Sequence, residues 1–314
     1  MVKINAYRLL RVVFVCLVLG GLWALWQWPD DNFHLVFCDV GQGDAILMSW
    51  GKTQILVDGG ADDRVLSCLG EHMPFWDRRL EMVILTHPEK DHGGGLISVV
   101  ERYKVSYFVS GVLGSSSAFY QELLAAVSKE NLCLINPWQD DELTIEGVKI
   151  RFYWPDKDWV AQQLSVNLQN LTNLNISNNS ILYQYNQGKI LVVDNKNISA
   201  NNFSSVFKVS FGNFDVLLTG DADQKVQPEI LATTSFPQVN VLKVAHHGSK
   251  YAFLDEVLLQ VKPELGIISV GKNPWGHPTQ TLLDQLKRFG IAVKRTDKDG
   301  TTEVISDGRR WWVL

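Results

Sequence analysis

The chain has 314 residues, enough for one large domain or two small ones. Its hydrophobic fraction of 46% and charged fraction of 20% exclude a largely disordered protein. The net charge of −5 excludes broad adhesion to a phosphate backbone, although a local basic groove remains compatible with it.

Residues 1–31 are predicted to form a membrane anchor. Apart from Arg11 and Gln27, strongly polar residues are absent between Leu9 and Trp28, and an apolar helix of about 17–20 residues can cross a bilayer. Basic residues precede this run and tryptophans crowd its far end, as the positive-inside rule and the aromatic belt require. We expect a single-pass protein with a cytoplasmic N-terminus. A cleaved signal peptide and a buried soluble helix are the alternatives.

The four cysteines form no CxxC pattern, which argues against a zinc ribbon and a thioredoxin-like redox motif. Cys16 lies in the apolar N-terminal run, which leaves an odd number outside it. A disulfide between Cys68 and Cys133 stays open as an alternative to free thiols.

Residues 32–314 are expected to form one domain outside the cytoplasm, in which short strands alternate with helices. Strands are expected at 34–40, 45–48, 54–57, 82–85, 241–245, 265–270, 292–295 and 302–306. Helices are expected at 65–69, 117–128, 252–260 and 279–289, the last with Thr279 as its N-cap. Two similar stretches, 180–194 and 205–221, each have the pattern of a hairpin. This order predicts an α+β fold with sheets packed face to face and helices outside.

The segment THPEKDHGGG, residues 86–95, carries the sharpest chemical signal. Four potential metal ligands lie within six positions directly after a buried strand. The glycines that follow let the backbone approach the site closely. Imidazole and carboxylate together suit zinc, manganese or iron. The alternative is a charged loop whose histidines are merely solvated.

Three later strands end in the same way, at Asp221, at the pair His246 and His247, and near His277. Strand ends on one edge of a sheet converge on one cleft, so these residues are expected to meet. Five of the seven histidines lie in these later segments and in residues 86–95. The other two, His34 and His72, carry no motif and are expected on the surface.

Six motifs in this order resemble the hydrolase domain of the ComEC competence proteins, within the metallo-β-lactamase superfamily. They are FCDVGQGD at 37–44, VDGG at 57–60, LTHPEKDH at 85–92, LTGD at 218–221, KVAHHGS at 243–249 and GHP at 276–278. The match runs from about residue 34 to the end of the chain. The resemblance implies a four-layer αββα sandwich, a site for two divalent metal ions and nuclease activity linked to DNA uptake.

The resemblance also assigns roles to individual residues. The expected metal ligands are His87, Glu89, Asp91, His92, Asp221, His246 and His247. The expected catalytic side chains are Asp91, His247 and His277. Three residues are expected to orient ligands from behind: Asp58, Asn202 and Ser205.

Two departures from the family pattern bear on the metals. Glu89 stands where related sequences have His or Asp, and the wider superfamily's next histidine is replaced by the Asn202–Ser205 segment. The remaining ligand set is rich in carboxylates, so manganese rivals zinc.

We expect an anchored metal-dependent phosphodiesterase or nuclease. Its partners would be the membrane, single-stranded DNA and a separate translocation channel protein. Two alternatives stay open: a metallohydrolase acting on a small ester, lactone or lipid phosphate, and a catalytically dead binding scaffold.

Overall fold

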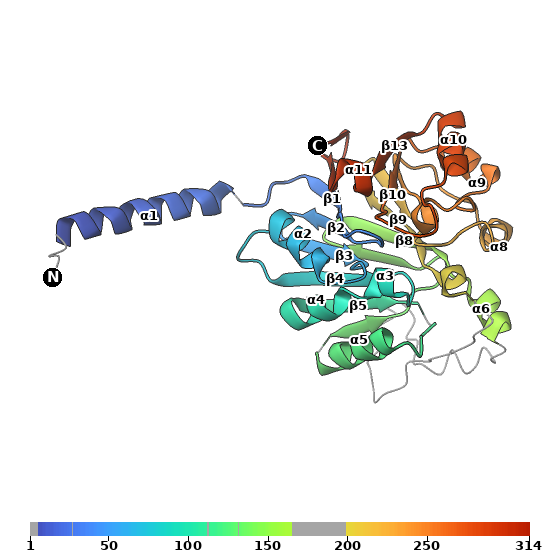
Figure 1. The fold of residues 1–314 in the computed structure, drawn as a ribbon, viewed down its shortest axis with the longest axis horizontal. Helices are drawn as coiled ribbons and strands as arrows, with labels where there is room; N and C mark the ends of the chain where they lie inside the picture. The colour runs from blue at the N-terminus through green and yellow to red at the C-terminus, as the bar shows by residue number, and fades with distance from the viewer. Residues whose placement is uncertain (1–5, 27, 112, 131, 165–198) are drawn as a thin grey trace.

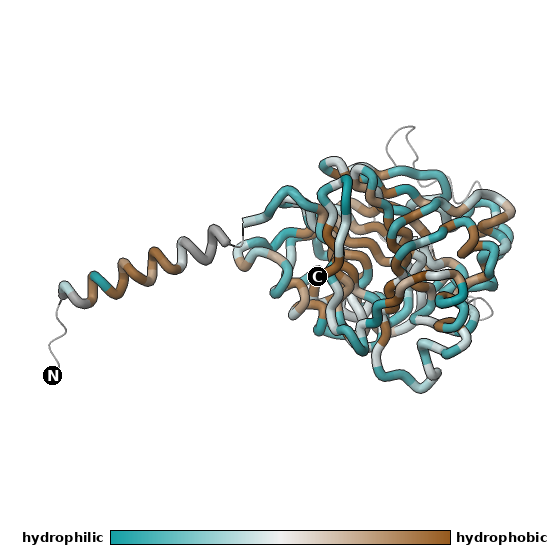
Figure 2. The backbone as a smooth tube through the Cα atoms, turned by 90° about the horizontal axis from the view of Figure 1, so that it is seen from above, coloured by the Kyte–Doolittle hydropathy of each residue, from teal (hydrophilic) through white to brown (hydrophobic). Residues whose placement is uncertain are grey.

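The computed structural model describes residues 6–26, 28–111, 113–130, 132–164 and 199–314. In these ranges two β-sheets lie face to face, and helices cover their outer surfaces (Figure 1). The predicted four-layer αββα sandwich is therefore confirmed. Apolar stretches concentrate along the interior strands of the domain (Figure 2).

The first sheet has eight strands in the order β15-β14-β1-β2-β3-β4-β5-β6. Their bounds are β1 Phe33–Phe37, β2 Ile46–Trp50, β3 Thr53–Val57, β4 Arg79–Leu85, β5 Lys104–Ser110, β6 Cys133–Ile135, β14 Thr302–Ser306 and β15 Trp311–Val313. Strands β3 to β6 run parallel, whereas the other pairs are antiparallel. The parallel strands bring their carboxyl ends to one edge, where β3 and β4 lead into the predicted site.

The second sheet has seven strands in the order β13-β12-β11-β10-β9-β8-β7. Their bounds are β7 Glu142–Ile145, β8 Val148–Trp154, β9 Val206–Phe211, β10 Phe214–Leu218, β11 Val241–Lys243, β12 Leu265–Ile268 and β13 Ala292–Arg295. Strands β10 to β13 run parallel. The ends of β10 and β11 carry the later ligand motifs.

The period of two along β1 shows how the sequence builds the layers. Phe33, Leu35 and Phe37 are buried between the two sheets, whereas Val36 points to the helices outside. The inner face of β14 follows the same rule with Val304. Strand β1 thus contributes to two cores at once.

Helices close both outer faces. Those on the first sheet are α2 Arg64–His72, α4 Leu96–Arg102 and α5 Ala118–Lys129; those on the second are α8 Gln227–Thr233, α9 Asp255–Val261 and α10 Gln280–Arg288. Leu123 of α5 and Leu286 of α10 are completely buried, so truncating either to alanine is expected to cost about 2–5 kcal/mol. Thr279 caps α10 as predicted, accepting a hydrogen bond from the Leu282 N–H at 3.4 Å.

The other described helical elements of the domain are α3 Lys90–Gly93, α6 Lys157–Leu164, α11 Thr296–Asp299 and the 3-10 turns Ala200–Phe203 and Ala245–Gly248. The hairpin predicted at 205–221 is formed by β9 and β10. Its predicted counterpart at 180–194 lies outside the described residues. Strands β5 to β8 were not individually predicted, although Val148, Ile150 and Phe152 of β8 alternate with exposed side chains.

The N-terminal segment forms α1, Ala6–Trp26, which projects away from the sandwich (Figure 1). Among the described residues, no helix combines the length and the apolar character that crossing a membrane requires. The transmembrane helix predicted within residues 1–31 is not supported by this structure.

Candidate metal site

Strand ends from both sheets meet at one pocket. Asp58 follows β3, and the segment from His87 to His92 follows β4. From the second sheet, Asp221 follows β10, and His247 follows β11. The predicted convergence of these distant segments is what the structure shows.

Four of these side chains approach one another as metal ligands do. Nε2 of His92 lies 3.3 Å from Oδ1 of Asp221. Nε2 of His247 lies 3.3 Å from Oδ2 of Asp91 and 3.6 Å from Oδ2 of Asp221. His92, His247 and Asp221 are buried. Two imidazoles and two carboxylates therefore face a common point.

The other ring nitrogen of each histidine is already held by the protein. Nδ1 of His92 lies 2.7 Å from Oδ2 of Asp58, and Nδ1 of His247 lies 2.9 Å from the Ser269 carbonyl oxygen. Both Nε2 atoms are buried and have no hydrogen-bond partner in the described part of the chain. Orphaned buried polar atoms are rare, and imidazoles fixed through the opposite nitrogen are typical metal ligands. The pocket fits a divalent cation.

Asp58 occupies the orienting position predicted for it. Its carboxylate accepts hydrogen bonds from the Thr86 N–H and hydroxyl, both at 2.8 Å, and contacts His92. The Asp58 backbone has a positive φ of 56°, which costs a residue with a side chain about 1–2 kcal/mol. Strain of this kind is typical of functional sites.

Asp44 and Lys243 lie on the side of the ligand histidines that is opposite to their Nε2 atoms. Donor atoms of Asp44, His92, Asp221 and His247 all lie within 4.8 Å of one another. Asp44, however, faces the Nδ1 side of the two histidines, at 3.7 Å from His92 and 3.4 Å from His247. It also contacts the Lys243 ammonium, which donates to the Gly220 carbonyl at 2.9 Å. We therefore assign Asp44 to charge balance and orientation, not to the metal-facing set.

The pocket concentrates negative charge. Burial lowers the pKa of His247, but Asp221 and Asp44 outweigh it and raise that pKa to about 10. Burial raises the pKa of Asp44, but Lys243 and the two histidines bring it down to about 2. The raised pKa of His247 shows that the carboxylates around it favour positive charge, and the lowered pKa of Asp44 shows that its own charge is stabilised by the neighbouring cations.

His87 and Glu89 flank the common point. The ring of His87 lies 4.1 Å from that of His92, and its buried Nε2 has no hydrogen-bond partner among the described residues. Burial and then His92 lower the pKa of His87 to about 3, so the ring is neutral and able to bind a metal. Glu89 is half-buried, and burial, Asp221 and Asp91 raise its pKa. Among the described residues, the group of donor atoms that lie within 4.8 Å of one another does not include Glu89.

His246 is turned away from its neighbour His247. Both residues have positive φ angles near 50°, and the Nε2 atoms of both rings approach Oδ2 of Asp221. Nδ1 of His246 lies 3.3 Å from Asp223, while Nε2 lies 4.0 Å from Asp221. The ring of His277 lies 5.6 Å from that of His246. These two histidines lie beside the metal-facing set.

Beside the predicted Asn202 and Ser205, the neighbouring Asn201 and Ser204 also reach the site, and the Ser205 N–H donates to the Thr86 carbonyl at 2.9 Å. The Asn201 side chain contacts Nε2 of His246 at 3.4 Å, and the Ser204 hydroxyl lies 3.3 Å from Nδ1 of His87 and accepts from the Asp221 N–H. Asn202 uses its backbone carbonyl to bind the Trp154 indole. The 3-10 turn at 200–203 sets this register, and a motif spacing alone could not reveal it.

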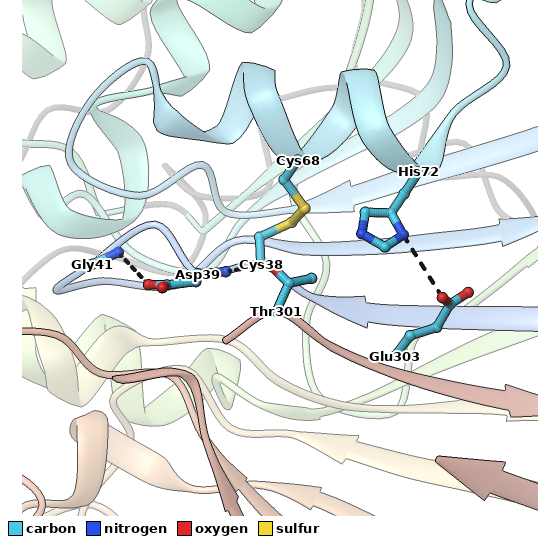
Figure 3. Close-up of a disulfide and its surroundings, with 7 residues drawn as sticks. All are labelled: Cys38, Asp39, Gly41, Cys68, His72, Thr301 and Glu303. Atoms are coloured by element: carbon cyan, nitrogen blue, oxygen red, sulfur yellow. Dashed lines mark hydrogen bonds and ion pairs between the residues drawn. A yellow bond between two sulfur atoms is a disulfide. The ribbon is translucent and has the colours of Figure 1, made fainter. Parts of the chain in front are cut away.

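A disulfide fixes the loop that carries Asp44. Cys68 of α2 pairs with Cys38, with the Cα atoms 5.9 Å apart (Figure 3), and Cys133 is free. The alternative pairing with Cys133 is therefore wrong. Further along this loop, Gly43 has φ +129° and packs against Asp91, where a Cβ would come 2.1 Å from the Asp91 carbonyl oxygen. Only glycine allows this approach.

Sequence reasoning missed Lys243 and Asp223 and left Asp44 undecided. Lys243 lies in an apolar strand and is completely buried. Its burial marks it as part of the site, but the sequence does not show that burial. Asp223 lies two positions after Asp221 and contacts His246. That spacing was visible in the sequence and could have been used.

No protein-family model matches the chain. ComE operon protein 3 of Bacillus subtilis is 27% identical over 308 residues, covering 92% of this chain and 35% of that protein. Recombination protein 2 of Haemophilus influenzae is 30% identical over 284 residues, covering 88% and 29%. Competence protein ComA of Neisseria gonorrhoeae is 25% identical over 283 residues, covering 88% and 32%. The chain thus spans about a third of the length of these relatives.

The chain resembles ComEC-type metallo-β-lactamase hydrolases. The sandwich, the order of the ligand motifs and the similarity to these competence proteins agree on this. The chain is thus similar to a part of these competence proteins and carries a potential site for a divalent metal ion.

Proposed function

We propose that this ComEC-like hydrolase is a phosphodiesterase that cleaves nucleic acid. The proposal rests on one observation: the His92 and His247 imidazoles meet Asp91 and Asp221. The buried Nε2 atom of each imidazole has no hydrogen-bond partner among the described residues. The names of the relatives, which refer to recombination and competence, support a nucleic-acid substrate.

We propose two divalent ions, zinc or manganese. His92, His247, Asp91 and Asp221 would hold one, while His87, Asp221 and Glu89 border the second position. Bound divalent ions lower the pKa of water to near neutrality and stabilise negative charge on a phosphate. The share of carboxylates among these ligands favours manganese.

The protein's own groups prepare the pocket for this chemistry. Asp58 and Thr86 fix the tautomer and orientation of His92, and Lys243 balances Asp44 behind it. His277 and His246 lie beside the metal-facing set, where an imidazole can hold a phosphate oxygen or protonate the leaving oxygen.

Hydrolysis of single-stranded DNA by the full-length chain, loaded with manganese or zinc, tests the proposal. Asp91→Ala is expected to abolish cleavage because it removes a metal-facing carboxylate. Asp297→Ala is the matched control, since Asp297 pairs with Arg295 on another part of the domain. Equal activity in Asp91→Ala and wild type would refute the assignment.

The same preparation separates the alternatives. Cleavage of a small ester, lactone or lipid phosphate without any cleavage of DNA would favour the small-substrate hydrolase. A weak dependence of DNA binding on salt would point the same way, since several phosphate contacts give a steep slope. A chain that retains no metal after mild purification would be a binding scaffold.

Membrane attachment through residues 1–31, a catalytic domain outside the cytoplasm and a separate channel partner stay proposals. Protease treatment of intact cells tests the orientation: an external domain is degraded, whereas protection of the domain in intact cells would contradict it.

A further inference from the structure

Trp275 is unusually exposed. It lies on the loop between β12 and α10, and 64% of its surface is accessible. Outside α1 this is the most exposed aromatic side chain among the described residues. A large indole left in water forgoes the favourable burial that drives folding, so its exposed position calls for an explanation.

The loop holds Trp275 in place. The Asn273 side chain donates to the carbonyls of Gly271 and His277, at 2.9 and 2.8 Å. Its carbonyl oxygen accepts from the N–H groups of Trp275 and His277, at 3.1 and 3.0 Å. Four hydrogen bonds from one side chain therefore fix the backbone on both sides of the tryptophan.

The loop is also attached to the metal site at both ends. At its start, the Gly271 N–H donates to the Gln42 side chain, on the loop that leads to Asp44. At its end, the Thr279 N–H donates to the Gly248 carbonyl at 2.9 Å, directly after His247. The position of Trp275 is thus coupled to the elements that carry the ligands.

A row of rings leads from Trp275 to the ligands. The Trp275 and His277 rings have centroids 6.2 Å apart, with planes 33° from parallel. The His277 and His246 centroids lie 5.6 Å apart, and Nε2 of His246 lies 4.0 Å from Asp221. Two histidines therefore separate the indole from a metal-facing carboxylate.

We propose that Trp275 stacks on a nucleobase next to the phosphodiester that is cleaved, and so selects single-stranded nucleic acid. The inference rests on the proposed function. A fixed, exposed indole is a suitable platform because every base has a π-face that stacks on aromatic side chains without sequence preference. A base paired inside a duplex has both faces covered, so the platform favours unpaired strands. Lys272, exposed on the same loop, supplies positive charge for the backbone.

Binding of labelled oligonucleotides to the full-length chain tests the proposal in the presence of EDTA, where hydrolysis does not interfere. The two probes are a twelve-nucleotide oligothymidylate and the same backbone carrying abasic tetrahydrofuran units, compared by fluorescence anisotropy. Wild type is expected to bind the base-containing strand roughly tenfold more tightly, as the loss of one stacking contact implies.

Three variants separate stacking from charge and from folding. Trp275→Ala is expected to bring the ratio of the two affinities close to one, whereas Trp275→Phe keeps most of it. Lys272→Gln is expected to weaken binding of both strands equally and leave the ratio unchanged. Trp312→Ala, which removes a partly exposed tryptophan of β15, serves as the control and keeps the wild-type ratio. Thermal unfolding of each variant verifies its fold.

A wild-type ratio of one, absence of binding to either strand, or an unchanged ratio in Trp275→Ala would overturn the proposal. Because binding is measured without metal, this outcome is independent of catalysis. A base preference without cleavage under manganese or zinc would refute the phosphodiesterase and leave the stacking platform standing. Cleavage without a base preference would refute the stacking platform and leave the phosphodiesterase standing.

Discussion

Two clusters of histidines and carboxylates occupy opposite ends of β1. At its far end lies the metal site with His92, His247 and their carboxylates. Near its start lies what we name the distal cluster: Asp30, His34, His72 and Glu303. His34 contacts Glu303 at 2.6 Å and Asp30 at 2.9 Å. His72 lies 3.8 Å from Glu303 (Figure 3).

The two clusters share residue types and differ in where the donor atoms point. In the distal cluster both nitrogens of His34 are engaged by carboxylates, and its side chain and that of His72 are 25% and 22% exposed. Both side chains are half-buried and keep the partial solvent exposure of surface residues. In the metal site the Nε2 atoms are buried and turned toward a shared point. Convergence of unengaged donors, not the presence of histidine, distinguishes a metal site.

The strongest test of this contrast is metal content. His247→Ala removes a metal-facing imidazole, so the metal affinity is expected to fall by more than the roughly 10–100-fold that follows loss of a residue orienting a ligand. His72→Ala is the matched variant in the distal cluster and is expected to retain the wild-type metal. Elemental analysis of both proteins measures the difference, and equal loss in both would erase the distinction.

The buried ion pair behind the ligands gives the next largest effect. Lys243→Met leaves Asp44 as an uncompensated buried carboxylate, which is expected to lower the free energy of unfolding by about 3–5 kcal/mol. Urea denaturation of the metal-free chain measures it. Asp44→Asn combined with Lys243→Met removes both charges and should recover much of the loss; no recovery would show that Lys243 acts through its packing.

Loss of the disulfide is expected to lower the free energy of unfolding somewhat less. Cys38 and Cys68 enclose a loop of 30 residues, and replacing both with alanine is expected to cost about 2–4 kcal/mol because the unfolded chain regains freedom. Thermal unfolding with and without a reductant measures the effect. Cys133→Ala should leave the response to reductant unchanged; an equally strong response in the double variant would mean that the disulfide is not its source.

The smallest effect comes from the distal cluster. Glu303 raises the pKa of His34, burial opposes this, and Asp30 adds to the increase. The resulting stabilisation is therefore present below the ordinary histidine pKa of about 6.5 and is lost as the pH rises through the raised value. It should stay below about 1 kcal/mol. Unfolding at several pH values should show a flatter profile for Glu303→Gln than for wild type; identical profiles would contradict the link.

The sequence by itself determined the layers and the ligand motifs. A short β-rich apolar run placed β1, and helical spacing with Thr279 placed α10, because such patterns depend on neighbours along the chain. The strand-end positions of His87, Asp91, His92, Asp221 and His247 followed from the same local logic. These residues met because parallel strands bring their ends to one edge.

Only the tertiary structure decided which atoms face the pocket. The side chains of Asn201 and Ser204 contact His246 and His87, whereas Ser205 contacts the site through its backbone N–H, which donates to the Thr86 carbonyl. The partnership of Lys243 with Asp44 and that of Cys68 with Cys38 join segments far apart in the chain. Local patterns carry no information about such pairs, because each depends on how separate elements pack.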